Sequence, residues 1–309
     1  MKLTFATRPS ALARWQTQHV IAKLQAAWPD LKCEEVVITT QGDRVLDKPL
    51  PVIGGKGLFT TELEQALLAG EVDAAVHSLK DLPTEDAPGL TVGAIPLRAD
   101  VRDALICPAG HGLAQLPARA VVGTSSIRRQ AQMLASRPDL QIQSIRGNVD
   151  TRIRKASQGQ YDAIILAAAG VNRLGLEQHI TQYFSLDLML PAPGQGALGI
   201  QSRADDARTR DLLAAIDHRP THLAVTAERA FLAALGGGCS LPVGALASLE
   251  GERLRLQGVV AAPDGKRILR VSTVNQIQSL EAAQNLGITL AQEAVAKGAH
   301  EILAQLDTK

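Results

Sequence analysis

Short apolar runs alternate with helical patterns through the first two thirds of the chain. The runs that we expect to form strands cover residues 2–6, 33–40, 74–77, 90–95, 104–107, 121–123, 142–145 and 161–167. Between the first two runs, apolar residues recur at helical spacing from Ser10, which is placed to cap a helix, to Ala27, just before Pro29. The alternation of strand and helix predicts an α/β fold with largely parallel sheets.

The last third of the chain has a different pattern. Its expected elements are a helix at residues 222–235, strands at 254–260 and 268–273, and a final helix at 281–296. Asp264-Gly265 is a good hairpin turn between the two strands. Strands gathered beside flanking helices predict a small α+β domain.

Two segments are expected to carry the chain between domains. Residues 96–103 are polar, and residues 190–199 are rich in proline and glycine. Elsewhere, Thr61 and Glu64 have the spacing of a capping box for a helix that ends at Gly70. A length of 309 residues allows two or three domains.

Composition narrows the range of functions. Aromatic residues are only 3% of the chain and the formal net charge is +1, which argues against a nucleic-acid binder. The small net charge hides a local excess of positive charge, because residues 121–160 contain seven Arg and Lys against two acids. A segment with a charge of +5 predicts an anionic ligand.

Cysteine usage indicates reduced thiols. Cys33, Cys107 and Cys239 are odd in number, and their spacings fit neither a disulfide framework nor paired zinc ligands. The N-terminal residues begin with a strand pattern rather than a signal peptide, and no stretch reaches eighteen apolar residues. We therefore expect a soluble protein that stays in the cytosol.

Charge appears abruptly after the apolar run at residues 74–77, at Lys80 and Asp81. In open α/β sheets, ligands bind beyond such strand ends. An isolated Lys-Asp pair is usually a solvated loop pair, but Asp81 is the only acid between Asp73 and Glu85. A lone carboxylate facing many cations suggests chemistry on an anionic substrate that develops positive charge.

Cations recur at other strand ends. Arg8 and Ser10 lie at a strand-to-helix turn, which favours anions. Lys56 lies among three glycines without the Walker spacing, which fits a lid better than a phosphate loop. The remaining candidates follow three later strands: Ser126, Arg128, Arg129, Arg146, Arg152 and Arg173. Arginines placed repeatedly at strand ends predict one shared crevice; three cations expected to be solvated on helix faces are Arg137, Arg154 and Lys155.

Nine segments match motifs of one known family: ATRPSALARWQ, GGKGLFTTELE, AAVHSLKDLP, VGTSSIRRQ, RGNVDTR, YDAIILAAAGVNRLGL, PAPGQGALGI, TAERAFL and GGGCSLPVGA. Each motif alone is weak, but together they are highly specific and cover nearly the whole chain. The sequence resembles the porphobilinogen deaminases, also called hydroxymethylbilane synthases. The resemblance implies two periplasmic-binding-protein-like α/β domains facing a cleft, plus a small C-terminal α+β domain. The implied domains are residues 1–98 with 196–216, residues 99–195, and residues 217–309.

The resemblance also implies an activity in porphyrin and heme biosynthesis. The family is a transferase that condenses four porphobilinogen molecules head to tail, with release of ammonia, into the linear tetrapyrrole hydroxymethylbilane. It builds this product on a dipyrromethane cofactor, which the resemblance attaches to Cys239 through a thioether. It further implies no metal, no nucleic-acid or membrane partner, and a cytoplasmic monomer.

Carried over position by position, the family's residues are the catalytic Asp81, the cofactor-binding Cys239, Lys80, Ser126, Arg128, Arg129 and Arg146, and the substrate-binding Arg8, Ser10, Lys56, Arg152 and Arg173. Six bound rings present about a dozen carboxylates for pairing with arginine, which accounts for the excess of cations. The chain departs from the family at Thr61, where a basic residue is common, and at Gln41, where Arg or Thr is usual. Both departures change the charge of the lid rather than the chemistry.

Two other classes of function stay open on the residues alone. An anion-binding module with the same cleft would need neither Asp81 nor a modified cysteine. A cysteine hydrolase would use Cys239, which from its position after a helix is more simply a buried, inert thiol. Such a hydrolase also needs a base, and neither His218 nor His222 lies in a recognisable catalytic motif.

Overall fold

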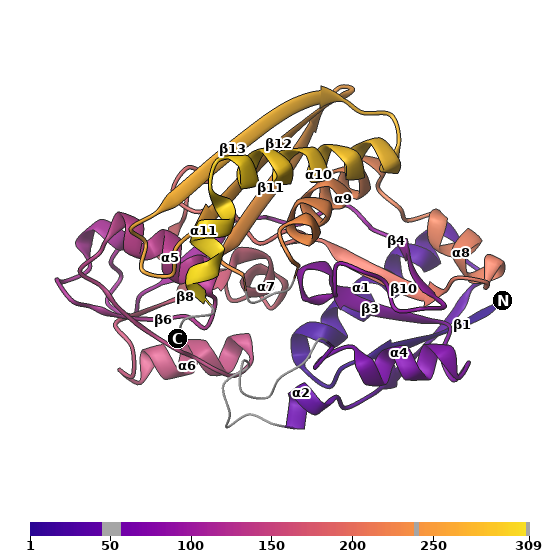
Figure 1. Ribbon diagram of the computed structural model, residues 1–309. Helices are drawn as coiled ribbons and strands as arrows, with labels where there is room; N and C mark the ends of the chain where they lie inside the picture. Colours follow the sequence, from indigo (N-terminus) through magenta and orange to yellow (C-terminus); the bar gives the residue numbers. More distant parts are fainter. Residues whose placement is uncertain (45–56, 238–240, 307–309) are drawn as a thin grey trace. The chain divides into compact units, whose positions relative to one another are not determined.

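The computed structural model describes residues 1–44, 57–237 and 241–306 (Figure 1). The chain forms two compact units, Met1–Ala99 with Ala197–His222 and Asp100–Gly196 with Leu223–Lys309. The boundaries expected for three domains, and the cleft between two of them, stay predictions. Lys56 and Cys239 lie outside the described residues.

The first unit is built around a five-stranded sheet with the order β2-β1-β3-β10-β4. The strands are β1 (Lys2–Thr7), β2 (Lys32–Val37), β3 (Ala74–Ser78), β4 (Leu90–Ala94) and β10 (Leu198–Arg203). The helices are α1 (Ala11–Ala27), α2 (Gln41–Arg44), α4 (Thr61–Leu68) and α8 (Ala207–Ala214), and η1 (Leu79–Asp81) is a single 3-10 turn. Core side chains of α1 and α8 pack on one face of the sheet and those of α4 on the other.

The two helix starts predicted in this unit have different outcomes. Ser10 caps α1 as predicted, because its hydroxyl accepts a hydrogen bond from the Ala13 amide at 3.3 Å. The capping box of Thr61 and Glu64 is wrong. The N-cap of α4 is Thr60, and the Thr61 hydroxyl donates to the Gly57 carbonyl at 2.9 Å.

The second unit contains a sheet with the order β7-β6-β8-β5-β9. The strands are β5 (Asp103–Ile106), β6 (Val121–Gly123), β7 (Gln141–Gln143), β8 (Ala163–Ala167) and β9 (Gln182–Tyr183). The helices are α5 (Ile127–Ser136), α6 (Val149–Ser157) and α7 (Ala168–Arg173), with 3-10 turns η2 (Leu113–Gln115) and η3 (Glu177–His179). The core side chains of α5 pack on one face of this sheet and those of α6 and α7 on the other.

Both five-stranded sheets share one layout, in which four strands run in one direction, as expected for largely parallel sheets, and one strand runs against them. Three strands run parallel, and the next strand, β10 or β5, runs antiparallel to both of its neighbours. Each antiparallel strand is the first strand that the chain forms after one of the predicted crossings. It therefore begins at the edge where the parallel strands end, so that Asp103 pairs with Ala167 and Leu198 with Ser78.

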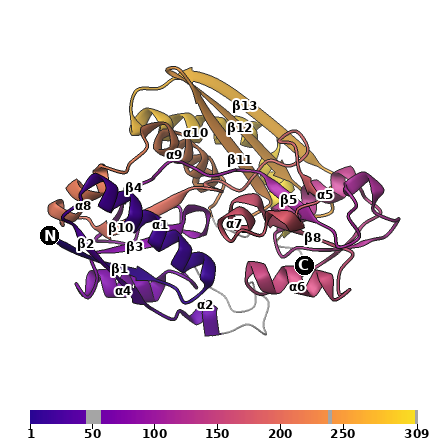
Figure 2. The ribbon, with the colours of Figure 1, turned by 180° about the vertical axis from the view of Figure 1, so that it is seen from behind.

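The C-terminal part of the second unit is a three-stranded antiparallel sheet beside helices, as Figure 2 shows from behind. Its elements are α9 (Arg219–Ala234), β11 (Val243–Glu250), β12 (Arg253–Ala261), β13 (Ile268–Gln276), α10 (Leu280–Ala296), α11 (Ala299–Leu303) and η4 (Ala304–Leu306). The predicted hairpin is confirmed, with Gly265 at a φ of +74° in the turn between β12 and β13. The α/β architecture with a small α+β part is therefore the one expected.

Candidate functional site at two sheet edges

The end of β3 carries Lys80 and Asp81 on the single turn η1. Leu79 anchors this turn, because its side chain is fully buried and its amide donates to the Ala197 carbonyl at 3.0 Å. Gly199 leaves room for that anchor, since a Cβ there would lie 2.9 Å from Leu79 Cδ1. Lys80 is half-buried and Asp81 is exposed. The buried Leu79 thus fixes the turn on the sheet, while Asp81 is exposed to solvent.

Arg8 follows β1, which is the parallel neighbour of β3, so both strand ends lie at one edge of the first sheet. Its Nε donates to Asp43 Oδ2 at 3.1 Å, its Nη2 pairs with Asp43 Oδ1, and its guanidinium lies 4.2 Å from the centre of the Phe59 ring. Burial pushes the pKa of Asp43 upward, but bonds from Arg8 and Thr40 outweigh it and hold that pKa below 3.8. Asp43 and Phe59 orient Arg8, and neither residue was predicted as a site residue from the sequence.

Beneath the same edge lies His77 of β3, which is 6% exposed. Burial lowers its pKa to about 4; a hydrogen bond with Gln201 opposes this shift, and the positive charge of Arg8 adds to it. His77 is therefore neutral near pH 7. The sequence showed only a histidine inside an apolar run.

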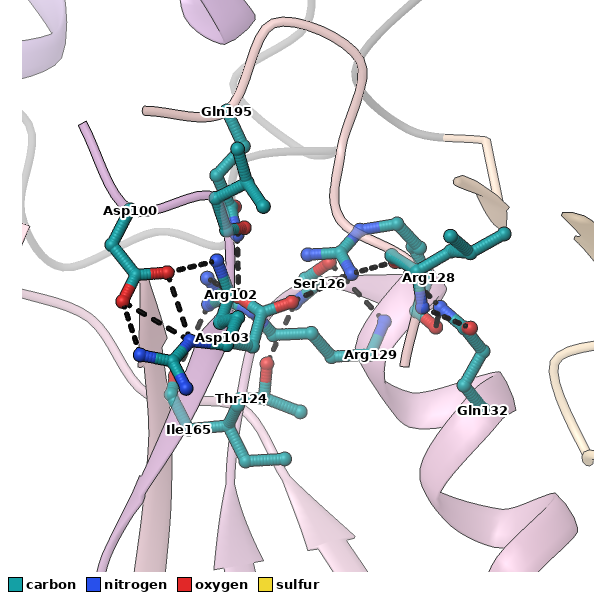
Figure 3. Close-up of polar contacts among 12 residues, drawn as sticks. Asp100, Arg102, Asp103, Thr124, Ser126, Arg128, Arg129, Gln132, Ile165 and Gln195 are labelled. Atoms are coloured by element: carbon teal, nitrogen blue, oxygen red, sulfur yellow. Dashed lines mark hydrogen bonds and ion pairs between the residues drawn. The ribbon is translucent and has the colours of Figure 1, made fainter. Parts of the chain in front are cut away.

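In the second unit, Asp103 accepts hydrogen bonds from two neighbouring arginines and a glutamine (Figure 3). Its Oδ2 accepts from Arg128 Nη1 at 2.8 Å. Its Oδ1 accepts from Arg129 Nε at 3.0 Å and Nη2 at 2.8 Å, and from Gln195 Nε2 at 3.0 Å. Asp103 is fully buried, and Arg128 and Arg129 are 4% and 7% exposed.

This network corrects the expectation that the arginines have no matching acid. Asp103 begins β5, in the segment expected to be a polar crossing, and it lies outside the window of residues in which the charges were counted. Ser126 is placed as expected, because it caps α5 and its hydroxyl accepts from the Arg129 amide at 3.4 Å. The start of α5 therefore holds both guanidinium groups beside the ends of β6 and β8.

Three further arginines lie beyond neighbouring strands of the second sheet. Arg152 Nε donates to the Gly147 carbonyl at 2.7 Å, and Lys155 Nζ donates to the Arg146 carbonyl at 3.0 Å. Arg173 is the last residue of α7, and its Nη2 donates to the Gly196 carbonyl at 2.7 Å. Burial lowers the pKa of Arg173 to about 10, so it stays a cation near pH 7.

The structure thus gathers the predicted residues into two sets, one at each sheet edge. The first unit carries Arg8, Ser10, Lys80 and Asp81, and the second carries Ser126, Arg128, Arg129, Arg146, Arg152 and Arg173. Lys56 and Cys239 were selected from the sequence and belong to neither set, since they lie outside the described residues.

Among the described residues, no three His, Cys, Asp or Glu side chains are grouped so that they could hold a metal ion. No helix among the same residues is long and apolar enough to cross a membrane.

Comparison with known proteins identifies the family. Residues 3–211 match the model of the porphobilinogen deaminase dipyromethane cofactor binding domain, and residues 222–296 match the porphobilinogen deaminase C-terminal domain. The porphobilinogen deaminase of Roseiflexus sp. (strain RS-1) is 50% identical over 302 residues, which are 98% of each chain. That of Brevibacillus brevis (strain 47) is 49% identical over 306 residues, 99% of this chain and 97% of the relative.

Among solved structures, the BenM effector binding domain with its effector benzoate aligns with a TM-score of 0.42 at 14% identity. This alignment covers 70% of this chain and 90% of that one. A likeness at this level adds nothing to the functional argument, which the sequence relatives carry. Both family models match the chain, and its relatives are about half identical to it over almost the full length. The chain therefore belongs to the porphobilinogen deaminase family.

Proposed function

We infer that this chain joins four porphobilinogen molecules head to tail and, with the uptake of one water that supplies the hydroxyl group, releases hydroxymethylbilane. Each condensation expels one ammonia, forms one carbon–carbon bond and releases one proton from the ring carbon that attacks. The observation that carries this inference is the 50% identity to a porphobilinogen deaminase over 98% of both chains. The turn with Asp81 and the arginine-bearing edge both lie inside the segment matched by the cofactor-binding model.

The residues at the edge of the second sheet suit a dipyrromethane group, whose two rings carry carboxylates. Arg128 is almost fully buried, yet within the described residues its Nε and Nη2 donate to no protein group. Guanidinium N–H groups that bond to no protein group can take a carboxylate in a charge-assisted, often bidentate, pair. When bound, the dipyrromethane supplies the pyrrole carbon to which the first substrate is joined.

We assign the carboxylates of the cofactor and the growing chain to separate sets of side chains. The cofactor set is Lys80, Ser126, Arg128, Arg129 and Arg146, with Cys239 as the point of attachment, and the substrate set is Arg8, Ser10, Lys56, Arg152 and Arg173. Guanidinium groups suit this task because each forms two parallel charge-assisted hydrogen bonds to one carboxylate. The half-buried positions of Arg146, Arg152 and Arg173 support the assignment.

Asp81 is the residue that we propose stabilises the reacting centre. Loss of ammonia leaves an electron-poor substrate carbon conjugated to a positive pyrrole nitrogen. A fixed carboxylate about 4 Å away contributes on the order of 4 kcal/mol at an effective dielectric near 20. The anchoring of η1 through Leu79 supports this role, because a held carboxylate needs no rearrangement as the charge develops.

The setting that we propose is the cytoplasm, with the chain acting as a monomer and without a nucleic-acid or membrane partner. Free thiols at Cys33 and Cys107 are in keeping with a reducing compartment. Light scattering of the purified protein should give the mass of one chain. A stable dimer at micromolar concentration would contradict the monomer.

The experiment that tests the function is intact-protein mass, followed by peptide mapping, on protein made in cells that supply porphobilinogen. The parent should carry the mass of two pyrrole units on Cys239 and consume porphobilinogen. Cys239→Ser should lack both the mass and the activity, whereas Cys33→Ser and Cys107→Ser should keep them. An unmodified Cys239 in an active preparation would overturn the thioether, and an unmodified, inactive parent would favour an anion-binding module.

A further inference from the structure

The turn between β12 and β13 packs against α5, and both ribbon views show the two side by side (Figure 1 and Figure 2). Gly265 makes the closest approach, because a Cβ on it would lie 2.4 Å from the Ala135 backbone nitrogen and 2.7 Å from the Leu134 carbonyl carbon. One helical turn earlier, Gln130 Nε2 donates to the Pro263 carbonyl at 3.1 Å. The turn therefore meets α5 at its backbone and through one hydrogen bond.

This contact needs a glycine for a reason beyond the shape of the turn. Gly265 has a φ of +74°, which favours glycine, and so does Gly251 in the turn between β11 and β12, at +62°. A Cβ on Gly251 would meet nothing within 4 Å, whereas a Cβ on Gly265 would collide with helix backbone, which has no flexible end that could move aside. A comparison of the two glycines therefore separates the demand of the turn from the demand of the contact.

The turn is itself held in a fixed shape. The Ala262 amide donates to the Arg267 carbonyl at 2.8 Å, and the Gly265 amide donates to the Ala262 carbonyl at 2.8 Å. The strands on either side of the turn pair without a break along their whole length, and their buried side chains belong to the core of the C-terminal part. A displacement at this contact therefore moves α5 rather than the turn.

Helix α5 connects the contact to the arginine-bearing edge of the second sheet. The helix begins after Ser126, whose carbonyl accepts from the Gln130 amide at 2.9 Å, and it carries Arg128 and Arg129 in its first turn. A helix of ten residues is about 15 Å long and moves as one body, because backbone hydrogen bonds tie each turn to the next. Met133 fixes the same helix in the core of the second sheet. The helix is thus held by that core and by the turn, and a shift at the turn reaches both arginines.

We propose that the turn between β12 and β13 positions α5, with Gly265 as the positioning residue. The C-terminal part then has a second task besides carrying the attachment cysteine, because it sets where the arginine pair lies at the edge of the second sheet. This inference rests on the proposed function, since the position of the pair is measured through loading of the dipyrromethane group. It concerns binding and not the chemistry at Asp81, which belongs to the other unit.

The first test compares Gly265→Ala with Gly251→Ala, because both place a Cβ on a left-handed residue of a hairpin turn and only the first adds the collision. Unloaded protein, made in cells that lack porphobilinogen, is incubated with increasing concentrations of it, and mass spectrometry follows the gain of two pyrrole units. In Gly265→Ala the concentration for half-maximal loading should rise about fivefold or more, because a small displacement of a binding group weakens its contacts strongly. The maximal loading rate per folded molecule should stay close to that of the parent. Gly251→Ala should lose stability alone.

These outcomes separate positioning from stability. A contact that only stabilises the fold would lower the folded fraction and leave the concentration for half-maximal loading unchanged. The same concentration in Gly265→Ala and Gly251→Ala would therefore overturn the proposal. A parent that gains no mass would instead contradict the proposed function.

Gln130→Leu tests the same contact without adding bulk, and it decides the matter if Gly265→Ala does not fold. Leucine has a similar size but cannot donate to the Pro263 carbonyl, so the concentration for half-maximal loading should rise about threefold. The control is Gln158→Leu, at an exposed position after α6, which should load as the parent does. Equal values in Gln130→Leu and Gln158→Leu would show that the turn does not position α5.

Discussion

Leu79 packs against Gly199 of the neighbouring antiparallel strand, so closely that a Cβ on Gly199 would lie 2.9 Å from Leu79 Cδ1. The contact matters because Leu79 begins the turn that ends in Asp81. The position of the carboxylate is therefore coupled to the absence of a side chain on another strand.

Gly199→Ala should displace this turn. We expect it to destabilise the protein by about 1–3 kcal/mol, because it overpacks a filled site, and to lower turnover of loaded enzyme. Gly93→Ala is the matched control, since its Cβ would lie 3.1 Å from Leu213 Cδ1. Thermal melts and porphobilinogen consumption should show a similar loss of stability in both variants and a loss of turnover only in Gly199→Ala. Equal turnover in the two variants would show that the contact between Leu79 and Gly199 does not set the position of Asp81.

Asp81→Asn should keep the fold and lose most of the turnover. The side chain is exposed, so the amide is tolerated, but it cannot stabilise a developing cation. Loss of a few kcal/mol of such stabilisation slows the reaction about a hundredfold or more. The control is Asp86→Asn, an exposed acid shortly downstream. Activity of Asp81→Asn within about threefold of the parent would remove Asp81 from this role.

Stability should fall between pH 6.5 and pH 4 because of His77. Its pKa is lowered from 6.5 to about 4 in the fold, so in this window the unfolded chain binds a proton that the folded chain does not. The stability is complete above pH 6.5 and is lost as the pH falls, by about 3 kcal/mol in all. Asp43, whose pKa is depressed, adds its loss only below 3.8.

Urea unfolding at pH 7 and pH 5 checks this slope. His77→Gln should reduce the difference between the two values, and His111→Gln, at an exposed position, should not. If the free energies of unfolding at pH 7 and pH 5 differ as much in His77→Gln as in the parent, a group other than His77 causes the pH dependence.

Arg173→Leu should let covalent intermediates accumulate. Each added ring brings carboxylates that need further cations, and Arg173 lies beyond a different strand from Arg128. Intact-mass spectra during turnover should therefore show a distribution of species unlike that of the parent. Arg154→Leu, an exposed arginine of α6, is the control. Identical distributions in Arg173→Leu and the parent would contradict binding in stages.

Much of the fold could be predicted because local patterns decide it. Ser10 caps α1 and the Asp264-Gly265 hairpin forms as expected, since each depends on neighbours in sequence. Strand direction could not be predicted for β5 and β10, because apolar runs look alike whichever way a strand enters a sheet. Asp103 was missed because it lay in the segment expected to be a polar crossing; it begins β5, and the antiparallel direction of β5 brings it to the same edge as Ala167.

The candidate site divides in the same way. Arg8 and Arg128 could be predicted because each follows an expected strand, and strand ends are visible in the sequence. Their partners Asp43 and Asp103 could not be predicted, because they lie 35 and 25 residues away along the chain. Only tertiary structure shows which acid meets which arginine, and a count of charges within a window does not replace it.

The place of β10 in the first sheet also sets an order of assembly. Among the strands that the structure describes, β3 and β4 are joined only through β10, residues 198–203, so this sheet stays open until most of the chain has been synthesised. The five-stranded sheet of the second unit is built from strands that follow one another along the chain, from Asp103 to Tyr183. On the ribosome the later sheet can close before the earlier one, and the N-terminal strands must wait, with unpaired edges exposed, for a strand made about a hundred residues later.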